Sequence, residues 1–201
     1  MNDYLLQERF IVYLSRVIAL ATHHRFHLRA ITEILSNSEF LKEVEQNDYS
    51  MMMEHTPVKL FTSMFEIETE ERLDGVYNDA YWCGYVYAKL FYHFKKPFGY
   101  LFLIMPLEEL LDYYPVYHEM DISALISLFE EKENSDTLLS SLLKRKKMSV
   151  RELSEKTGIS TNSLTYYKKS NAHLYKGSFM AIKKIARALN VNDNTFLETV
   201  G

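Results

Sequence analysis

The chain has 201 residues, of which 47% are apolar and 25% charged, and its formal net charge is −4. This composition is ordinary for a globular protein with a substantial core. Cys83 is the only cysteine, which excludes a disulfide framework within one chain, and a lone thiol beside nine methionines favours a reducing cytoplasm.

Neither a secretory signal nor a membrane-spanning helix is expected. The first ten residues, MNDYLLQERF, contain an early acidic residue and no uninterrupted apolar stretch. The longest apolar run, Phe98 to Met105, is far shorter than the ~20 residues that cross a bilayer. We therefore expect a cytoplasmic protein with no membrane partner.

The small net charge conceals two segments of opposite sign. Residues 136–201 contain 12 Lys or Arg and 5 Asp or Glu, a net charge of +7, whereas residues 1–135 contain 11 and 22, a net charge of −11. Aromatic residues divide as unevenly, because 23 of the 28 precede residue 136. The polar run Glu130–Asp136 separates two apolar periodic segments. These features predict an acidic, aromatic-rich domain over 1–132 and a basic domain over 136–201.

The acidic domain is predicted to be mainly helical. Apolar residues recur from Leu5 through Ile34 without Pro or Gly, and a further long helix is expected over Leu73–Phe94. Short strands remain an alternative at Tyr49–Met53 and Tyr114–Tyr117. Residue types typical of a helix start occur at Thr56 followed by Pro57, at Pro106, and at Asp121.

Aromatic side chains concentrate in the helix expected over Leu73–Phe94. Such side chains fill cores and interfaces more often than they bind ligands, so we interpret them as packing residues, with a ligand pocket as the less favoured alternative. The residues concerned are Tyr77, Tyr81, Trp82, Tyr85, Tyr87, Tyr92 and Phe94.

No catalytic or metal-binding pattern stands out. His23 and His27 are four residues apart, but His24 occupies the position where a zinc hydrolase of the H-E-x-x-H type has glutamate, and no third ligand is evident. The sequence contains only six glycines and lacks a phosphate-binding loop, a dinucleotide fingerprint and a nucleophile elbow. We expect no enzyme activity, no metal and no cofactor.

The basic domain is predicted to contain closely spaced helices. Ser149 stands three residues before Glu152, the spacing of a capping box, and Gly158 is well suited to end that helix. Ser160 can then cap the next helix at once. Two further helices are indicated by apolar stripes at Leu138, Leu139, Leu142 and Leu143, and, after a Ser178 cap, at Phe179, Ile182, Ile185, Ala186 and Leu189.

The helix after Ser160 is predicted to have a polar outer face. If Leu164 and Tyr167 point inward at helical spacing, the outward side chains are Thr161, Asn162, Thr165, Tyr166 and Lys169. A loop over Ser170–Gly177 follows, and a short fifth helix is expected near Phe196 and Leu197. A helix, a tight glycine turn and a second helix with an exposed polar face indicate a helix-turn-helix.

The run LLKRKKMSVRELSEKTGISTNSLTYYKK, followed by FMAIKKIARALNV, resembles the Cro/C1 (XRE) family of helix-turn-helix DNA-binding domains. The resemblance covers roughly residues 136–200 and implies a five-helix, lambda-repressor-like fold, so the whole chain is expected to be all-α. Val150 departs from the glutamine usual in the family, and Lys168 and Ser170 from its usual acidic residue and glycine.

The resemblance implies that helix 161–168 enters the major groove of double-stranded DNA. The expected base contacts are Thr161, Asn162, Thr165 and Tyr166, of which Asn162 can pair bidentately with adenine. The expected phosphate contacts are Lys144, Lys147, Ser149, Arg151, Lys168, Lys169 and Lys176.

We interpret the chain as a sequence-specific transcriptional regulator, such as a repressor, that acts as a homodimer through residues 1–132. One alternative is an antitoxin-like or phage-encoded inhibitor whose acidic domain binds a basic partner protein, while the helix-turn-helix controls its own gene. A role in protein interaction alone suits the basic domain less well, because its charge of +7 favours DNA.

Overall fold

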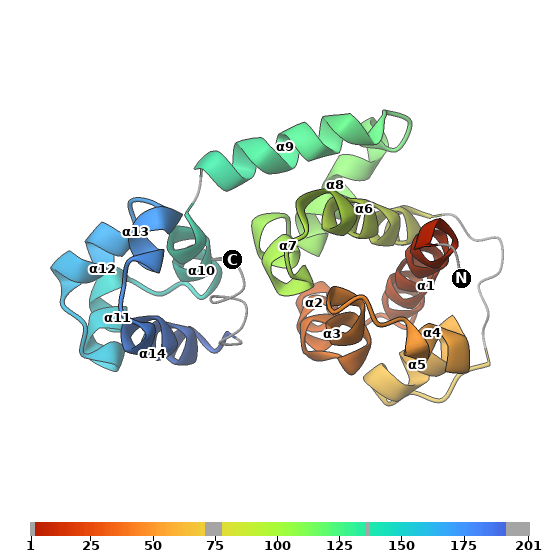
Figure 1. Cartoon of the computed structure of the whole chain (residues 1–201), viewed down its shortest axis with the longest axis horizontal. Helices are drawn as coiled ribbons and strands as arrows, with labels where there is room; N and C mark the ends of the chain where they lie inside the picture. Colours follow the sequence, from red (N-terminus) through yellow and green to blue (C-terminus); the bar gives the residue numbers. More distant parts are fainter. Residues whose placement is uncertain (1–2, 71–77, 136, 192–201) are drawn as a thin grey trace. The chain divides into compact units, whose positions relative to one another are not determined.

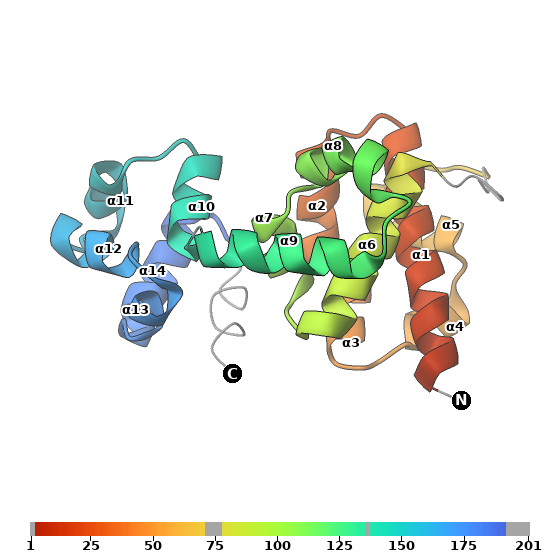
Figure 2. The ribbon, with the colours of Figure 1, turned by 90° about the horizontal axis from the view of Figure 1, so that it is seen from above.

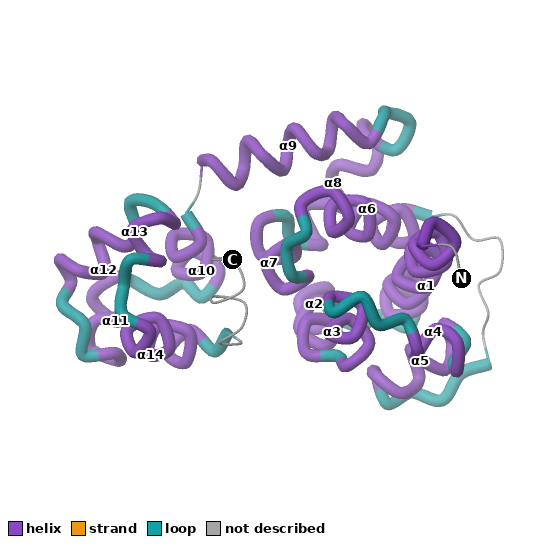
Figure 3. Tube along the Cα trace, in the orientation of Figure 1, coloured by secondary structure: helices purple, strands orange, loops and turns teal. Residues whose placement is uncertain are grey.

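The computed structural model describes residues 3–70, 78–135 and 137–191. Within these ranges every regular element is an α-helix and none is a strand (Figure 1, Figure 3). The all-α prediction is therefore confirmed. Contacts divide the chain into two compact units, Met1–Ser127 and Leu128–Gly201, and the division falls inside α9 (Ile122–Ser135). None of the described helices combines the length and apolarity needed to cross a bilayer.

The first unit packs its helices around a central pair, α1 and α6, which lie side by side (Figure 1, Figure 2). In chain order the helices that precede α9 are α1 (Asp3–His23), α2 (Leu28–Asn37), α3 (Glu39–Glu45), α4 (Ser50–Glu54), α5 (Pro57–Phe65), α6 (Asp79–Phe94), α7 (Phe98–Ile104) and α8 (Leu107–Tyr117).

The apolar periodicity from Leu5 to Ile34 is divided between two helices. α1 ends at His23, and Arg25 adopts a left-handed conformation with φ of 60°. His27 then caps α2, because its Nδ1 accepts the backbone N–H of Arg29 at 3.3 Å. The chain therefore turns between α1 and α2 without the Gly or Pro that usually marks a helix end in a sequence.

The backbones of α1 and α6 meet with no side chain between them at Gly84. A Cβ at this position would lie 2.6 Å from the nitrogen of Ser15 and 2.9 Å from the carbonyl carbon of Leu14, closer than van der Waals contact allows. Ser15 is itself completely buried. Two small residues therefore set how closely the central helices of the unit approach.

Aromatic rings fill the space beside this crossing. The ring centroid of Phe10, on α1, lies 5.6 Å from that of Phe98, and Phe91 stacks on Phe98 at 4.7 Å. The buried Tyr87 donates its hydroxyl hydrogen to the carbonyl oxygen of Met105 at 2.7 Å. Tyr87 thus combines a buried ring with a satisfied hydroxyl, as the packing interpretation of these aromatics requires.

Three local expectations for the first unit need correction or completion. Tyr49–Met53 overlaps α4 and Tyr114–Tyr117 belongs to α8, so neither segment is a strand. At the start of α4 the Asp48 carboxylate accepts the N–H of Ser50 at 2.9 Å. The helix expected over Leu73–Phe94 is described from Asp79 onward, after an Asn78 cap, because residues 71–77 lie outside the described ranges.

The polar run Glu130–Asp136 is helical as far as Ser135 rather than a loop. Asp121 caps α9 as predicted, since its carboxylate accepts the N–H of Ser123 at 2.8 Å. Leu125 and Phe129 are buried at i, i+4 spacing, which gives the helix an apolar stripe. That stripe allows α9 to extend through the charged residues.

The second unit holds five helices after the last turns of α9 within its described residues. They are α10 (Leu138–Arg145), α11 (Val150–Thr157), α12 (Thr161–Tyr167), α13 (Asn171–Tyr175) and α14 (Phe179–Leu189). Its core is aliphatic, and all four leucines of the predicted stripe on α10 are buried. The buried side chains include Leu138, Leu139, Leu142, Leu143, Leu153, Leu164, Leu174, Ile182, Ile185, Ala186 and Leu189.

Two predictions in this unit are wrong. The segment expected as a loop over Ser170–Gly177 contains α13. Phe179 was expected in the core but is 55% exposed, since it is the first residue of α14, and the ammonium of Lys183 lies 5.7 Å from its ring centroid. The fifth helix expected near Phe196 and Leu197 lies outside the described residues.

Replacing Gly84 with Ala should destabilise the protein by at least ~1–3 kcal/mol, because the added methyl group forces α1 and α6 apart. Chemical denaturation followed by circular dichroism measures the change. His93→Ala, at an exposed position on α6, is the control and should stay within ~0.5 kcal/mol of the wild type. Equal stability of the Gly84 variant and the wild type would contradict the close crossing.

Candidate nucleic-acid interface

The first helix of the predicted motif, α11, begins with a reciprocal cap. The Glu152 N–H donates to the Ser149 hydroxyl oxygen at 3.1 Å, and the Ser149 N–H donates to the Glu152 carboxylate at 2.7 Å. The predicted capping box is confirmed. The hydrogen bonds from the N–H and hydroxyl of Ser149 lower the pKa of Glu152 below its ordinary 4.5.

The turn after α11 satisfies its polar groups internally. Gly158 ends the helix in the left-handed conformation, with φ of 69°. The buried Thr157 hydroxyl donates to the carbonyl oxygen of Leu153 at 2.7 Å and accepts the N–H of Ile159 at 3.2 Å. The Ser154 hydroxyl donates to the carbonyl oxygen of Ile159 at 2.6 Å. These bonds hold the chain reversal from both ends.

The second helix, α12, starts three residues after α11 ends. The Ser160 hydroxyl oxygen accepts the N–H of Ser163 at 3.1 Å, which confirms the predicted cap. Leu164 is completely buried and Tyr167 is half-buried, so these two residues mark the inner face. The outward side chains are all exposed, namely Thr161, Asn162, Thr165, Tyr166 and Lys169.

The side chains expected to contact phosphates are exposed and come from several elements of the second unit. Lys147 lies in the turn after α10 with φ of 49°. Arg151 forms an ion pair with Glu155, one turn along α11, at 3.3 Å. The full exposed set is Lys144, Lys147, Ser149, Arg151, Lys168, Lys169 and Lys176.

One neighbour of the predicted base contacts could not be assigned from the sequence. His173, on α13, stacks on Tyr166 with ring centroids 4.2 Å apart and planes 15° from parallel. The segment around His173 was expected to be a loop, and a loop gives no basis for assigning a partner to Tyr166.

The geometry consists of two short helices at a tight glycine turn, the second with an exposed polar face, inside a unit of leucine-rich helices. Residues 139–200 match the family model of the Cro/C1-type HTH DNA-binding domain. The C-terminal third is a Cro/C1-type helix-turn-helix domain. Neither the search of curated proteins nor that of solved structures found a match for the chain.

The Cro/C1-type domain supports a DNA-binding regulator. The second helix of the motif is α12. Residues preceding 139 lie outside the match, so the role of the acidic unit must be argued from its own residues.

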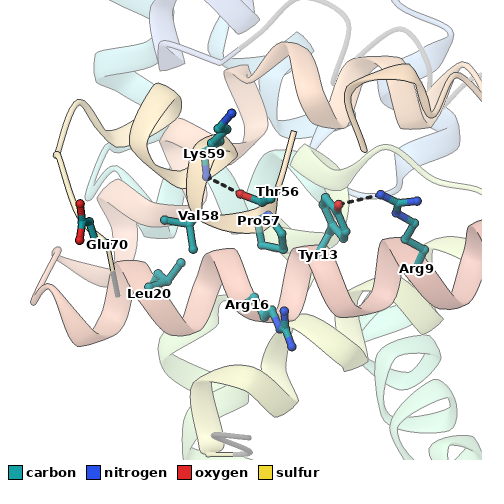
Figure 4. A pocket seen from close by; sticks show the side chains of 9 residues that line it. All are labelled: Arg9, Tyr13, Arg16, Leu20, Thr56, Pro57, Val58, Lys59 and Glu70. Atoms are coloured by element: carbon teal, nitrogen blue, oxygen red, sulfur yellow. Dashed lines mark hydrogen bonds between the residues drawn. The ribbon is translucent and has the colours of Figure 1, made fainter. Parts of the chain in front are cut away.

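The first unit contains a pocket of about 830 Å³ between α1, α5 and the residues that follow α5 (Figure 4). The aliphatic side chains of Leu20 and Val58 lie between the two helices, whereas those of Lys59 and Arg16 point to opposite sides. A ligand site usually has a few polar groups that converge on one point. These charged groups diverge, so we assign no ligand to the pocket.

The histidines and the cysteine of the first unit that could take part in chemistry lie in positions that favour a structural role. His23 ends α1 and His27 caps α2, so the two imidazoles do not share one helix face. Burial raises the pKa of the Cys83 thiol, with a smaller contribution from the charge of Asp79, which makes this thiol a poor nucleophile. Among the described residues no cluster of three metal-ligating side chains occurs.

Acid should weaken the cap of α11. Because the folded pKa of Glu152 is lowered, its stabilising contribution is present above pH 4.5 and is lost as the pH falls through that lowered pKa. An NMR titration of the Glu152 carboxyl carbon should give a midpoint below 4.5 in the wild type and a higher one in Ser149→Ala. The same midpoint in both proteins would refute a contribution from the hydroxyl.

Proposed function

We propose that the protein is a sequence-specific DNA-binding transcriptional regulator that reads the major groove with residues 161–168. The observation that carries the proposal is the exposed polar face of α12 within a Cro/C1-type domain. Leu164 anchors this helix in the core, so the polar face cannot turn inward without exposing a buried leucine.

The proposed base contacts are four side chains of α12. Asn162 is assigned the leading role, because its amide can accept from N6 and donate to N7 of one adenine. Thr161 and Thr165 offer methyl groups to thymine and hydroxyls to base edges. Tyr166 contributes a phenol hydroxyl. All four are exposed, so none must leave the core to reach DNA.

Six cations and Ser149 are the proposed phosphate contacts. Exposed ion pairs such as Arg151 with Glu155 contribute little to stability, so Arg151 can exchange this carboxylate for a phosphate. The Ser149 hydroxyl oxygen accepts the N–H of Glu152, and its hydrogen donates to the Glu152 carboxylate, so a contact with DNA requires this hydrogen to exchange the carboxylate for a phosphate oxygen. Affinity that rests on phosphate contacts should fall steeply as the salt concentration rises.

Selection of duplex DNA from a random pool by the full-length protein at ~150 mM salt tests this function. We expect a defined operator composed of two half-sites related by two-fold symmetry. Recovery of no preferred sequence would contradict a sequence-specific regulator. The operator then allows single contacts to be tested.

Asn162→Ala should weaken operator binding by ~1–3 kcal/mol and relax the preference at one base position, because a bidentate contact to that base is removed. Lys168→Ala is the contrast, since loss of a phosphate contact should weaken all sequences alike and lower the salt slope by about one. Fluorescence anisotropy with operator variants at several salt concentrations measures both effects. An Asn162 variant with unchanged base preference would remove this residue from the proposed contacts.

We further propose that the protein is a homodimer held by the predicted acidic domain, residues 1–132, which includes the first unit. One short helix reads few base pairs, and helix-turn-helix dimers gain specificity from half-sites about one helical turn, ~34 Å, apart. Light scattering should therefore give twice the 23.7 kDa mass of the chain. A monomer mass at micromolar concentration would rule out the dimer.

The charge of the first unit favours a second candidate function. With 22 acidic and 11 basic residues before residue 136, this part of the chain suits an antitoxin-like or phage-encoded inhibitor that binds a basic partner protein. The helix-turn-helix would then control the gene of the inhibitor itself. A stoichiometric basic partner that co-purifies and dissociates at high salt would favour this candidate.

A further inference from the structure

Tyr166 is the aromatic residue among the four proposed base contacts, and another side chain covers one face of its ring. The imidazole of His173 stacks on it in near-parallel geometry, with centroids 4.2 Å apart. Tyr166 nevertheless remains 44% exposed. The ring is therefore held from one side while a large part of the side chain faces solvent.

The segment that carries His173 is tied to the start of α10. The Asn171 carboxamide oxygen accepts the N–H of Leu138 at 2.7 Å, and the Thr137 hydroxyl donates to the carbonyl oxygen of Lys168 at 2.9 Å. Leu174, one residue after His173, is completely buried. α13 is thus anchored at several points and offers His173 a fixed position.

The same segment also closes on the other tyrosine at the end of α12. A Cβ at Gly177 would lie 3.2 Å from Cζ and 3.3 Å from the hydroxyl oxygen of Tyr167, so the backbone at Gly177 lies directly against that ring. The segment 171–177 therefore contacts the last turn of α12 at two neighbouring aromatic residues. These contacts hold the end of the helix.

The His173 ring is not oriented by a hydrogen bond at Nδ1. This atom is buried and has no hydrogen-bond partner among the residues that the structure describes. A buried polar atom without a partner is uncommon and calls for an explanation, such as a functional role. The stack on Tyr166 is the contact that the structure shows for the face of the ring.

We propose that His173 is a positioning residue for base recognition, which holds the Tyr166 ring so that its phenol hydroxyl meets the operator. The inference rests on the proposed function. An exposed tyrosine samples several rotamers, and ordering it on binding weakens affinity. A ring already held by His173 avoids this loss, which corresponds to roughly three- to tenfold in affinity.

The test compares operator and non-specific DNA binding by the full-length protein and its variants. His173→Ala should weaken operator binding roughly three- to tenfold, and non-specific binding by less than about twofold. His173→Phe, which keeps a flat ring for the stack, should restore operator affinity. In a Tyr166→Ala background, His173→Ala should have no further effect, because the residue that it positions is already absent.

Besides unchanged operator binding by His173→Ala, three outcomes would overturn the inference. They are equal losses on operator and non-specific DNA, no rescue by His173→Phe, and a full effect of His173→Ala in the Tyr166→Ala background. Circular dichroism of each variant shows whether α13 and the core stay folded. A wild type that selects no operator overturns the proposed function itself, whereas a wild type that binds its operator as tightly as His173→Ala does overturns only the role of His173.

Discussion

The chain reversal between α11 and α12 is the constraint on which the proposed DNA contacts depend. Gly158 adopts the left-handed conformation of the reversal without the backbone strain that a side chain adds, and the hydroxyls of Thr157 and Ser154 pair with backbone groups on both sides of it. Since α12 starts three residues after α11 ends, this turn sets the direction of α12. A change of φ at Gly158 would redirect every proposed base contact together, whereas loss of one exposed side chain removes a single contact.

The two units contribute in different ways to the proposed regulator. The second unit carries +7 and exposes its polar and cationic side chains, so it supplies both the base contacts and the salt-dependent affinity. Residues 1–135 carry −11, which disfavours contact with phosphate, so the roles proposed for them are assembly or the binding of a partner. The chain therefore joins a basic part, for which DNA contact is proposed, to an acidic part, for which it is not.

Features set by neighbouring residues were predictable from the sequence, and features set by distant contacts were not. The caps at Ser149, Ser160 and Thr56 and the stop at Gly158 depend on residues within a few positions, and all were predicted. The left-handed Arg25 breaks an apolar pattern that continues through it, so local propensity gave no warning. α13 and the stack of His173 on Tyr166 depend on partners across the unit, which spacing alone does not reveal. The sequence places Gly84 within a predicted helix, but it does not reveal that α1 crosses α6 at this residue.

At Gly84 the backbones of α1 and α6 are in direct contact, so no side chain lies between the two helices at this point. Side chains at an ordinary helix interface can change rotamer and let helices slide, but a backbone has no such freedom. A ligand or partner that binds the first unit and shifts one of these helices would therefore move α1 and α6 together as a rigid pair. A side chain at position 84 would require α1 and α6 to move apart at the point where they cross.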